Sequence, residues 1–171
     1  MPHQCVAALS ASIAFDWTGP PSFAPRARKV AERALKTIAF HEDGEKFNVW
    51  VAYLNLEATY GQPDPAESVS KLFQRALSYA DQKKLYMAMI GICERTDKAE
   101  LCRQCLKTAC KKFSASCKVW LRHITYLMSL GDQDEAKKVL DRALQSMPRR
   151  KHVKLLSQVA LAEFRLGSAE R

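Results

Sequence analysis

The chain has 171 residues, which is enough for one domain or a short repeat array, and 47% of them are hydrophobic. Lysine and arginine outnumber aspartate and glutamate by 27 to 18, giving a formal charge of +9. This balance favours an anionic partner, with nucleic acid first and an acidic protein surface second. No run of about 18 apolar residues occurs, so we expect no transmembrane span and no membrane partner. Six cysteines without a signal peptide indicate reduced thiols inside the cell.

The first part of the chain, residues 1–25, is expected to be irregular. The run Asp16-Trp17-Thr18-Gly19-Pro20-Pro21 and Pro25 interrupt any continuous helix there. From Arg26 onward the apolar residues recur at helical spacing, and the first helix is expected at 26–39. Its buried face is predicted to consist of Ala27, Val30, Ala31, Ala34 and Leu35.

The stretch 48–77 is typical of a helical hairpin. Gly61 is expected to end the first helix, because glycine tolerates left-handed backbone angles. The run Asp64-Pro65-Ala66-Glu67 is expected to start the second helix, with an aspartate cap, a proline in the first turn and a glutamate that completes a capping box. The second helix is predicted to bury Val69, Leu72, Phe73, Ala76 and Leu77.

This hairpin recurs along the chain with a period near 34 residues. The arginine position of the second helix falls at Arg33, Arg75, Thr108 and Arg142. The aromatic position of the first helix falls at Trp50, Tyr86 and Trp120, and then at Lys154. Asp-x-x-Glu runs beginning at Asp64, Asp97 and Asp132 are expected to mark the starts of three second helices. A period near 34 with two helices per unit is typical of tetratricopeptide-like arrays.

We therefore predict an all-α fold, a right-handed α-solenoid of antiparallel helix pairs. Three complete pairs are expected at 46–79, 82–113 and 117–147, after the leading helix 26–39 and before a trailing helix 150–166. The repeat array is expected to span 26–171 and to be truncated at its C-terminal end, because residues 167–171 repeat the turn that precedes a second helix.

Trp50, Glu57 and the run Arg75-Ala76-Leu77 resemble the half-a-TPR (HAT) repeat, which occurs mostly in RNA-processing assemblies. The words AERALKTI (31–38) and EKFNVWVAYLNLE (45–57) are similar to the C-terminal HAT region of the family of ribosomal RNA-processing protein five. The resemblance implies a HAT array that follows OB-fold RNA-binding repeats, absent from this chain. It also implies a nucleolar role in early pre-rRNA processing and small-subunit assembly.

Three cysteines, Cys102, Cys105 and Cys110, look like part of a zinc site. They fall on the apolar stripe of one predicted helix, where the sister repeats carry alanine and leucine, so we expect them in the core. His123 as a fourth ligand has no support in the sequence. No phosphate loop, His-Glu-x-x-His motif or histidine beside a nucleophile is recognisable, so we predict no enzymatic activity and no cofactor.

The basic residues form two clusters on predicted helices. Arg103, Lys107 and Lys111 are four residues apart, so they share one face, and Arg149-Arg150-Lys151 open the last helix. An ordinary solvated surface is an equally good interpretation of this pattern. The candidate RNA- or partner-binding residues are Arg103, Lys107, Lys111, Lys112, Lys118, Arg122, Arg149, Arg150, Lys151 and Lys154. We expect such binding to be electrostatic and sequence-tolerant, because Trp50 and Trp120 are assigned to the core and not to a stacking platform.

Glu57 and Arg75 are expected to form a pair that ties the two helices of one repeat together. The function predicted for the chain is a non-catalytic scaffold of ribosome biogenesis in the nucleus and nucleolus. Its expected partners are pre-ribosomal proteins and pre-rRNA, and whether it forms a homodimer is open. The first alternative is a HAT scaffold of pre-mRNA splicing or 3′-end processing, and the second is a cysteine-based metal or redox module.

Overall fold

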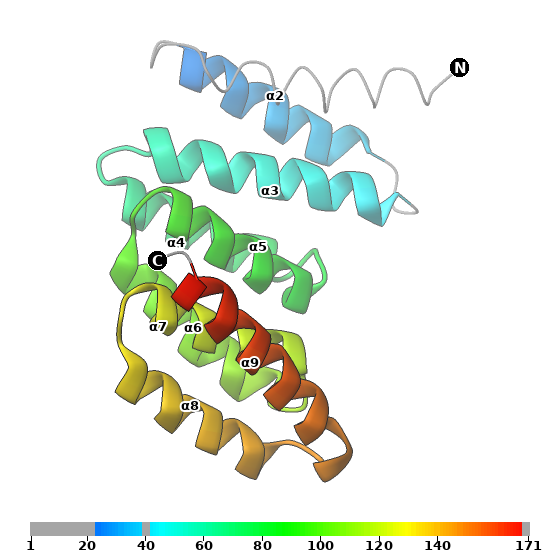
Figure 1. Ribbon diagram of the computed structural model, residues 1–171. Coiled ribbons are helices and arrows are strands. Elements are labelled where there is room, and N and C mark those ends of the chain that lie inside the picture. Colours follow the sequence, from blue (N-terminus) through cyan, green and yellow to red (C-terminus); the bar gives the residue numbers. More distant parts are fainter. Residues whose placement is uncertain (1–22, 39–41, 169–171) are drawn as a thin grey trace. The chain divides into compact units, whose positions relative to one another are not determined.

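The computed structural model describes residues 23–38 and 42–168, and all regular elements in these ranges are helical (Figure 1). The elements are α2 (Ala24–Thr37), α3 (Asp43–Tyr60), α4 (Pro65–Ala76), α5 (Gln82–Arg95), α6 (Ala99–Lys112), α7 (Cys117–Ser129), α8 (Gln133–Ser146), the 3-10 helix η3 (Arg149–Lys151) and α9 (His152–Ser168). The predicted all-α class is confirmed. In the described part of the chain, no helix is both long and apolar enough to cross a membrane.

The three predicted helix pairs correspond to α3 with α4, α5 with α6, and α7 with α8. The leading helix α2 begins at Ala24, so Pro25 lies in its first turn, where a missing N–H removes no hydrogen bond. The helix therefore begins two residues before the predicted start at residue 26. The rest of the predicted irregular segment, residues 1–22, and the end of the predicted array, residues 169–171, lie outside the described residues.

The chain divides into two compact units, one up to Cys102 and one from Arg103 onward. In the first unit, α3 packs against α2, α4 and α5 (Figure 1). Its core contains Leu54, Val69 and Leu85, all without exposed surface. The ring of Phe73 on α4 meets that of Tyr86 on α5 edge-to-face, with centroids 5.0 Å apart.

The predicted buried faces of the two helices are confirmed in part, because Leu77, which follows the end of α4, is only partly buried, as are Ala27 and Leu35 of α2. Val69, Leu72, Phe73 and Ala76 are buried, as are Ala31 and Ala34. Val30, however, is exposed. Consecutive residues of a helix are about 100° apart around its axis, so Val30 points to one side of the stripe on which Ala31 lies.

The turn between α3 and α4 uses Gly61 for a different reason from the expected one. Its backbone is extended, with φ −62° and ψ 142°, so no left-handed conformation is required. Instead, a Cβ at this position would lie 2.5 Å from the Glu57 carbonyl oxygen and 2.9 Å from the Cα of Pro65. Glycine is therefore needed for close packing of the two helices.

The predicted cap of α4 is confirmed at Asp64, whose carboxylate accepts hydrogen bonds from the backbone N–H groups of Ala66 (3.2 Å) and Glu67 (3.1 Å). The Glu67 carboxylate lies 2.6 Å from the Lys71 ammonium, so it forms an ion pair along the helix. The aspartate thus caps the helix as predicted, while the glutamate supports it through an i,i+4 pair.

Asp97 does not start α6 as predicted, but ends α5. Its φ is 52° and that of Gly131 is 78°, and these two residues are 34 positions apart. Each is followed by a backbone N–H that donates to the carbonyl five residues earlier, at 2.9 and 3.0 Å. This is the left-handed C-terminal cap of a helix. The predicted repeat matched Asp97 with Asp132, but the structural equivalent of Asp97 is Gly131, the residue before Asp132. Asp132 itself does cap α8, because its carboxylate accepts a hydrogen bond from the N–H of Glu135.

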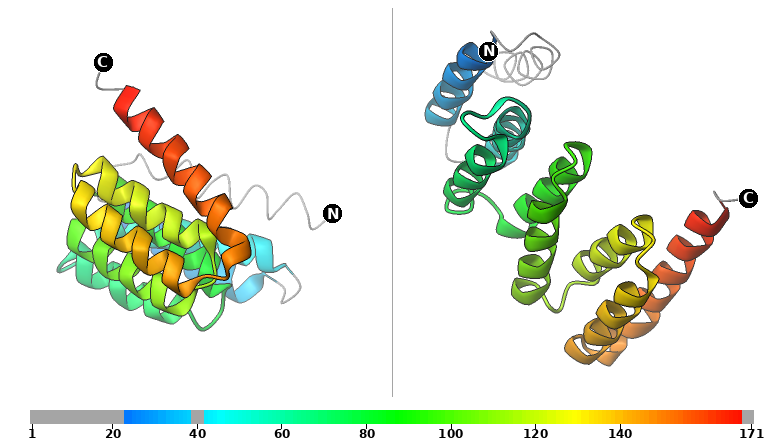
Figure 2. Two further views of the ribbon diagram at one scale, coloured as in Figure 1. Left: turned by 60° about the horizontal axis from the view of Figure 1, so that its bottom comes forward. Right: turned by 90° about the vertical axis from the view of Figure 1, so that its left-hand side faces the viewer.

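In the second unit, α7 packs against both α8 and α9, and η3 leads from α8 into α9 (Figure 2). The core contains Leu106, Ile124, Val139 and Leu155. Leu155 is fully buried whereas Lys154 is exposed, so the repeat position of Trp120 falls on Leu155 and not on Lys154.

Candidate functional site

The predicted basic stripe lies on the exposed face of α6. Arg103, Lys107 and Lys111 are all exposed, whereas Cys102 and Cys105 on the opposite face are buried. Within the described residues, no carboxylate lies within ion-pair distance of these three cations. Their charges are therefore available to an anion in solution.

The second predicted cluster meets the first at the turn between α6 and α7. The Lys151 ammonium donates a hydrogen bond to the Ala115 carbonyl (2.6 Å), which fixes η3 beside this turn. The turn itself is held by the Trp120 indole N–H, which donates to the Ser114 carbonyl (2.7 Å). Lys112, Lys118, Arg149, Arg150 and Lys154 are exposed on these elements, and Arg122 is partly buried. We call this set of ten predicted residues the basic surface; it lies within the second unit.

The cations on α6 and on η3 experience different helix fields. Lys111 and Lys112 lie in the last turn of α6, where the C-terminal carbonyl groups favour positive charge. Arg149 and Arg150 precede the N-terminus of α9, where the helix dipole disfavours it. An anion bound beside η3 would offset this repulsion, so the arrangement favours an anionic ligand.

The cysteines of α6 are core residues, as predicted, and one of them contacts His123, which the sequence offered only as an unsupported fourth ligand. The Cys110 Sγ lies 3.5 Å from the His123 Nδ1, and both side chains are buried. Burial raises the pKa of Cys110 to about 12 and lowers that of His123 to about 4. Both groups are neutral at physiological pH, so the pair lacks the thiolate that nucleophilic and redox cysteines need. Among the described residues, no three His, Cys, Asp or Glu side chains are placed to hold a metal ion.

Glu57 and Arg75 do not pair with each other, which corrects the prediction. Glu57 binds Arg28 of α2, with 2.5 Å between the carboxylate oxygen and Nε. The Arg28 guanidinium also donates to the Tyr60 carbonyl (2.9 Å) at the end of α3. Both residues of the repeat motif therefore fasten their repeat to the preceding helix, because Arg75 likewise binds α2.

Arg75 makes a two-pronged ion pair with Glu32 of α2, at 2.6 and 2.9 Å. This guanidinium holds the pKa of Glu32 below its ordinary value. The guanidinium also lies over the Trp50 ring, 5.3 Å from the ring centroid. Burial, followed by the charge of Glu32, raises the pKa of the adjacent Tyr53 to about 12.

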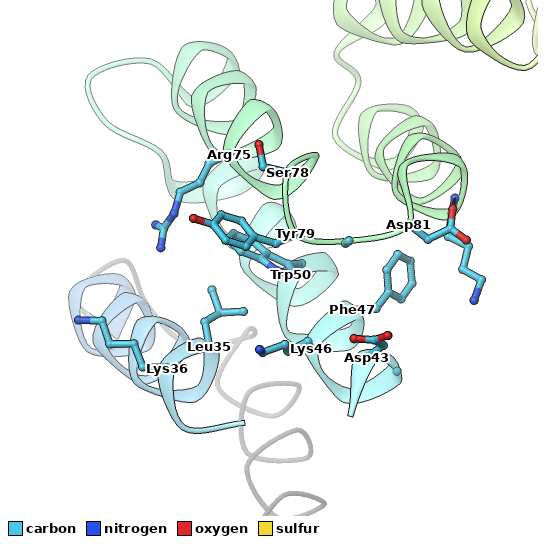
Figure 3. A pocket seen from close by; sticks show the side chains of 13 residues that line it. Leu35, Lys36, Asp43, Lys46, Phe47, Trp50, Arg75, Ser78, Tyr79 and Asp81 are labelled. Atoms are coloured by element: carbon cyan, nitrogen blue, oxygen red, sulfur yellow. Dashed lines mark hydrogen bonds between the residues drawn. The ribbon is translucent and has the colours of Figure 1, made fainter. Parts of the chain in front are cut away.

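A groove of about 840 Å³ opens beside this cluster in the first unit (Figure 3). Its floor is formed by Trp50, on which the ring of Tyr79 stacks with 6.0 Å between centroids and 14° between planes. Lys36, Lys46 and Lys84 line its walls, from α2, α3 and α5 respectively. Trp50 is buried as predicted, whereas Tyr79, in the turn after α4, occupies no repeat position and was not among the predicted candidates.

The chain is similar to proteins that act in rRNA biogenesis. It is 50% identical to "rRNA biogenesis protein RRP5" of Arabidopsis thaliana over 147 residues, which are 85% of this chain and 8% of that protein. It is 39% identical to "Protein RRP5 homolog" of Homo sapiens over 146 residues, again 85% of this chain and 8% of that protein. To "rRNA biogenesis protein rrp5" of Schizosaccharomyces pombe it is 37% identical over 145 residues. The chain thus spans about 8% of the length of these relatives. No protein-family model matches it.

Proposed function

We propose, from the premise that the chain is related to one region of the RRP5 proteins, that it is a non-catalytic helical scaffold in ribosome biogenesis. Its partners are pre-rRNA and pre-ribosomal proteins, its place is the nucleolus, and its contribution is to small-subunit assembly. The names of the relatives support the process, and a fold made of successive helix pairs supports the scaffold role. The proposal concerns this region, because the relatives extend far beyond it.

The observation that carries the RNA contact is the basic surface. Its cations lie on α6, α7, η3 and α9, and the hydrogen bond from Lys151 to the Ala115 carbonyl holds η3 beside the turn that follows α6. Lysine and arginine side chains that neutralise phosphates release condensed counterions, so the binding is electrostatic and tolerant of sequence. The helices hold the charged side chains in place, and binding requires no recognition of individual RNA bases.

The test is a charge reversal of the stripe, Arg103→Glu, Lys107→Glu and Lys111→Glu together. Each phosphate contact to a single strand contributes about 0.7 to the slope of log K against log salt, so losing three should flatten the slope by about 2. Affinity for a labelled single-stranded pre-rRNA fragment would be measured by fluorescence anisotropy over a range of salt concentrations. All three residues are exposed, so the circular dichroism spectrum and melting temperature should change little.

The matched control reverses three exposed lysines outside the basic surface, with Lys29→Glu, Lys71→Glu and Lys137→Glu. This variant has the same net charge as the first, so it separates a local contact from the overall charge of the protein. We expect its slope of log K against log salt to differ from that of the wild type by less than about 0.7, the contribution of one phosphate contact. An equal loss in both triple variants, or no loss in the first, would identify the stripe as ordinary surface.

Capture of the full chain's partners from nuclear extract tests the process. We expect enrichment of pre-rRNA and small-subunit assembly factors. Enrichment of small nuclear RNAs instead would support a scaffold of pre-mRNA splicing and would overturn the assignment to ribosome biogenesis.

A further inference from the structure

We propose that the groove of the first unit binds single-stranded RNA, with an unpaired base stacked on Tyr79 and the flanking phosphates held by lysines. This inference extends the proposed function, because it assigns a second RNA contact of a different chemistry to the other unit. The basic surface supplies charge alone, whereas the groove combines charge with an exposed aromatic ring (Figure 3).

The ring of Tyr79 is a platform that is already oriented. Its side chain is 69% exposed, yet one of its faces is fixed against the buried Trp50 ring at an angle of 14°. Trp50 is held in turn by the Arg75 guanidinium, which Glu32 binds through two hydrogen bonds. An aromatic ring held flat with its other face open offers a base a stacking surface at little cost in side-chain entropy.

The charges around the ring favour an anionic ligand. Lys36, Lys46 and Lys84 line the groove together with two carboxylates, Asp43 and Asp81. The Asp81 carboxylate is engaged as the N-cap of α5, where it accepts hydrogen bonds from two backbone N–H groups at 2.9 and 3.1 Å. Lysines outnumber carboxylates three to two at the walls, and they come from three different helices around the ring.

The size of the groove fits a short stretch of nucleotides. Its volume of about 840 Å³ lies within the range of roughly 300–1,000 Å³ that binding clefts for small molecules occupy. A planar platform flanked by point charges matches a base and its phosphates better than an extended peptide, whose backbone needs hydrogen-bond partners along its length. We therefore assign the groove to RNA, and an acidic peptide with an aromatic residue is the competing ligand to be tested.

The experiment measures binding of a labelled single-stranded RNA by the full chain carrying Tyr79→Ala or Lys84→Glu. We expect Tyr79→Ala to lower the affinity roughly tenfold, as stacking on one aromatic ring implies. Tyr79→Phe keeps the ring and should bind like the wild type. Phe23→Ala removes an exposed ring outside the groove and should have no effect. Lys83→Glu, next to Lys84 but outside the groove, is the matched control for charge.

The salt dependence separates this inference from the proposed function. Loss of stacking should lower the affinity of Tyr79→Ala by the same factor at every salt concentration, whereas the α6 charge reversal should flatten the slope. If Tyr79→Ala and Lys84→Glu bind RNA like the wild type while the α6 variant is impaired, the groove inference fails and the proposed function stands. If the α6 variant keeps its slope while Tyr79→Ala is impaired, the groove alone is the RNA site.

The competing ligand gives its own outcome. An acidic peptide containing a tryptophan would be titrated against the same set of variants. Peptide binding that depends on Tyr79, together with RNA binding that does not, would overturn the assignment to RNA. Cross-linking by ultraviolet light provides an independent readout, because a stacked base should become attached to the peptide that contains Tyr79.

Discussion

At the scale of single residues, burial decides the chemistry of His123. Desolvation lowers the pKa of its imidazole to about 4, Lys107 and Arg142 add to the shift, and Glu135 opposes it. The unfolded chain therefore binds one more proton than the folded protein between about pH 4 and pH 6.5. Protein stability should then decrease as the pH falls from 6.5 to 4, by an amount on the order of 3 kcal/mol.

The variant His123→Leu tests this. Its unfolding free energy, measured in urea from pH 7 to pH 4, should decrease less steeply than that of the wild type, whatever its absolute value. Identical pH profiles for wild type and His123→Leu would show that the imidazole is not buried in its neutral form.

A second residue-scale prediction concerns Gly61. Its missing side chain allows the backbone of Glu57 and Pro65 to approach, and backbone atoms cannot move aside as flexible side chains do. We expect Gly61→Ala to destabilise the protein by about 1–3 kcal/mol, the usual cost of overpacking. Gly44→Ala is the control, since no atom lies within 4 Å of its added Cβ, and a helical alanine should stabilise slightly. Thermal melting of the two variants should therefore shift in opposite directions.

At the scale of helices, α2 is fastened to the following repeat by Arg28 and Glu57. Their side chains are 28% and 9% exposed, so removing the arginine leaves a nearly buried carboxylate without its cation. We expect Arg28→Met to cost about 2–3 kcal/mol. Lys71→Met removes a far more exposed pair, 74% and 54% exposed, and should cost less than about 0.5 kcal/mol.

The double variant Arg28→Met/Glu57→Gln completes a thermodynamic cycle. Neutralising both partners should restore most of the lost stability, because the penalty comes from the unpaired charge and not from the missing bond. Urea unfolding of the four proteins provides the measurement. An equal loss of unfolding free energy in Arg28→Met and Lys71→Met would mean that burial does not strengthen the ion pair between Arg28 and Glu57.

The helices themselves could be predicted closely, because a period of 3.6 residues and the aspartate caps are local signals. The partners of the motif residues could not. Whether Arg75 reaches Glu57 or Glu32 depends on how α2 lies against α3 and α4, which no local pattern specifies. The role of Gly61 likewise depends on how closely two backbone segments approach in the turn. Asp97 was misaligned because the residue that ends one helix and the residue that caps the next are adjacent, as at Gly131 and Asp132.

At the scale of the whole molecule, the candidate sites were predictable to different degrees. The α6 stripe follows from spacing alone, since cations four residues apart share one face. Its union with the cluster at η3 rests on the contact between Lys151 and Ala115, 36 residues apart in the chain, and only the fold brings these together. The groove could not be predicted, because Tyr79 becomes an oriented ring only by stacking on Trp50, which the fold brings next to it. A single tyrosine in a turn belongs to no recognisable sequence motif.

An apolar stripe on α9 leads to the last prediction, which concerns association of whole chains. Val153, Leu156 and Phe164 are exposed on one side of this helix, Val153 and Phe164 by 77% and 75%. Contiguous exposed apolar surface favours association, because contact removes it from water. We therefore expect the purified chain to form dimers or larger species as its concentration increases, measured by sedimentation velocity.

The variant Val153→Lys/Phe164→Lys places two charges in this stripe and should remain monomeric over the same concentrations, with unchanged helix content because both side chains are exposed. The control Val30→Lys/Leu130→Lys adds the same charge at exposed apolar residues of other elements, α2 and the turn after α7, and it should associate like the wild type. The comparison matters for the RNA measurements as well, since a dimer presents two basic surfaces and would raise the apparent affinity without any new contact. A monomeric wild type at all concentrations would contradict the prediction and would assign the salt slope of RNA binding to a single chain.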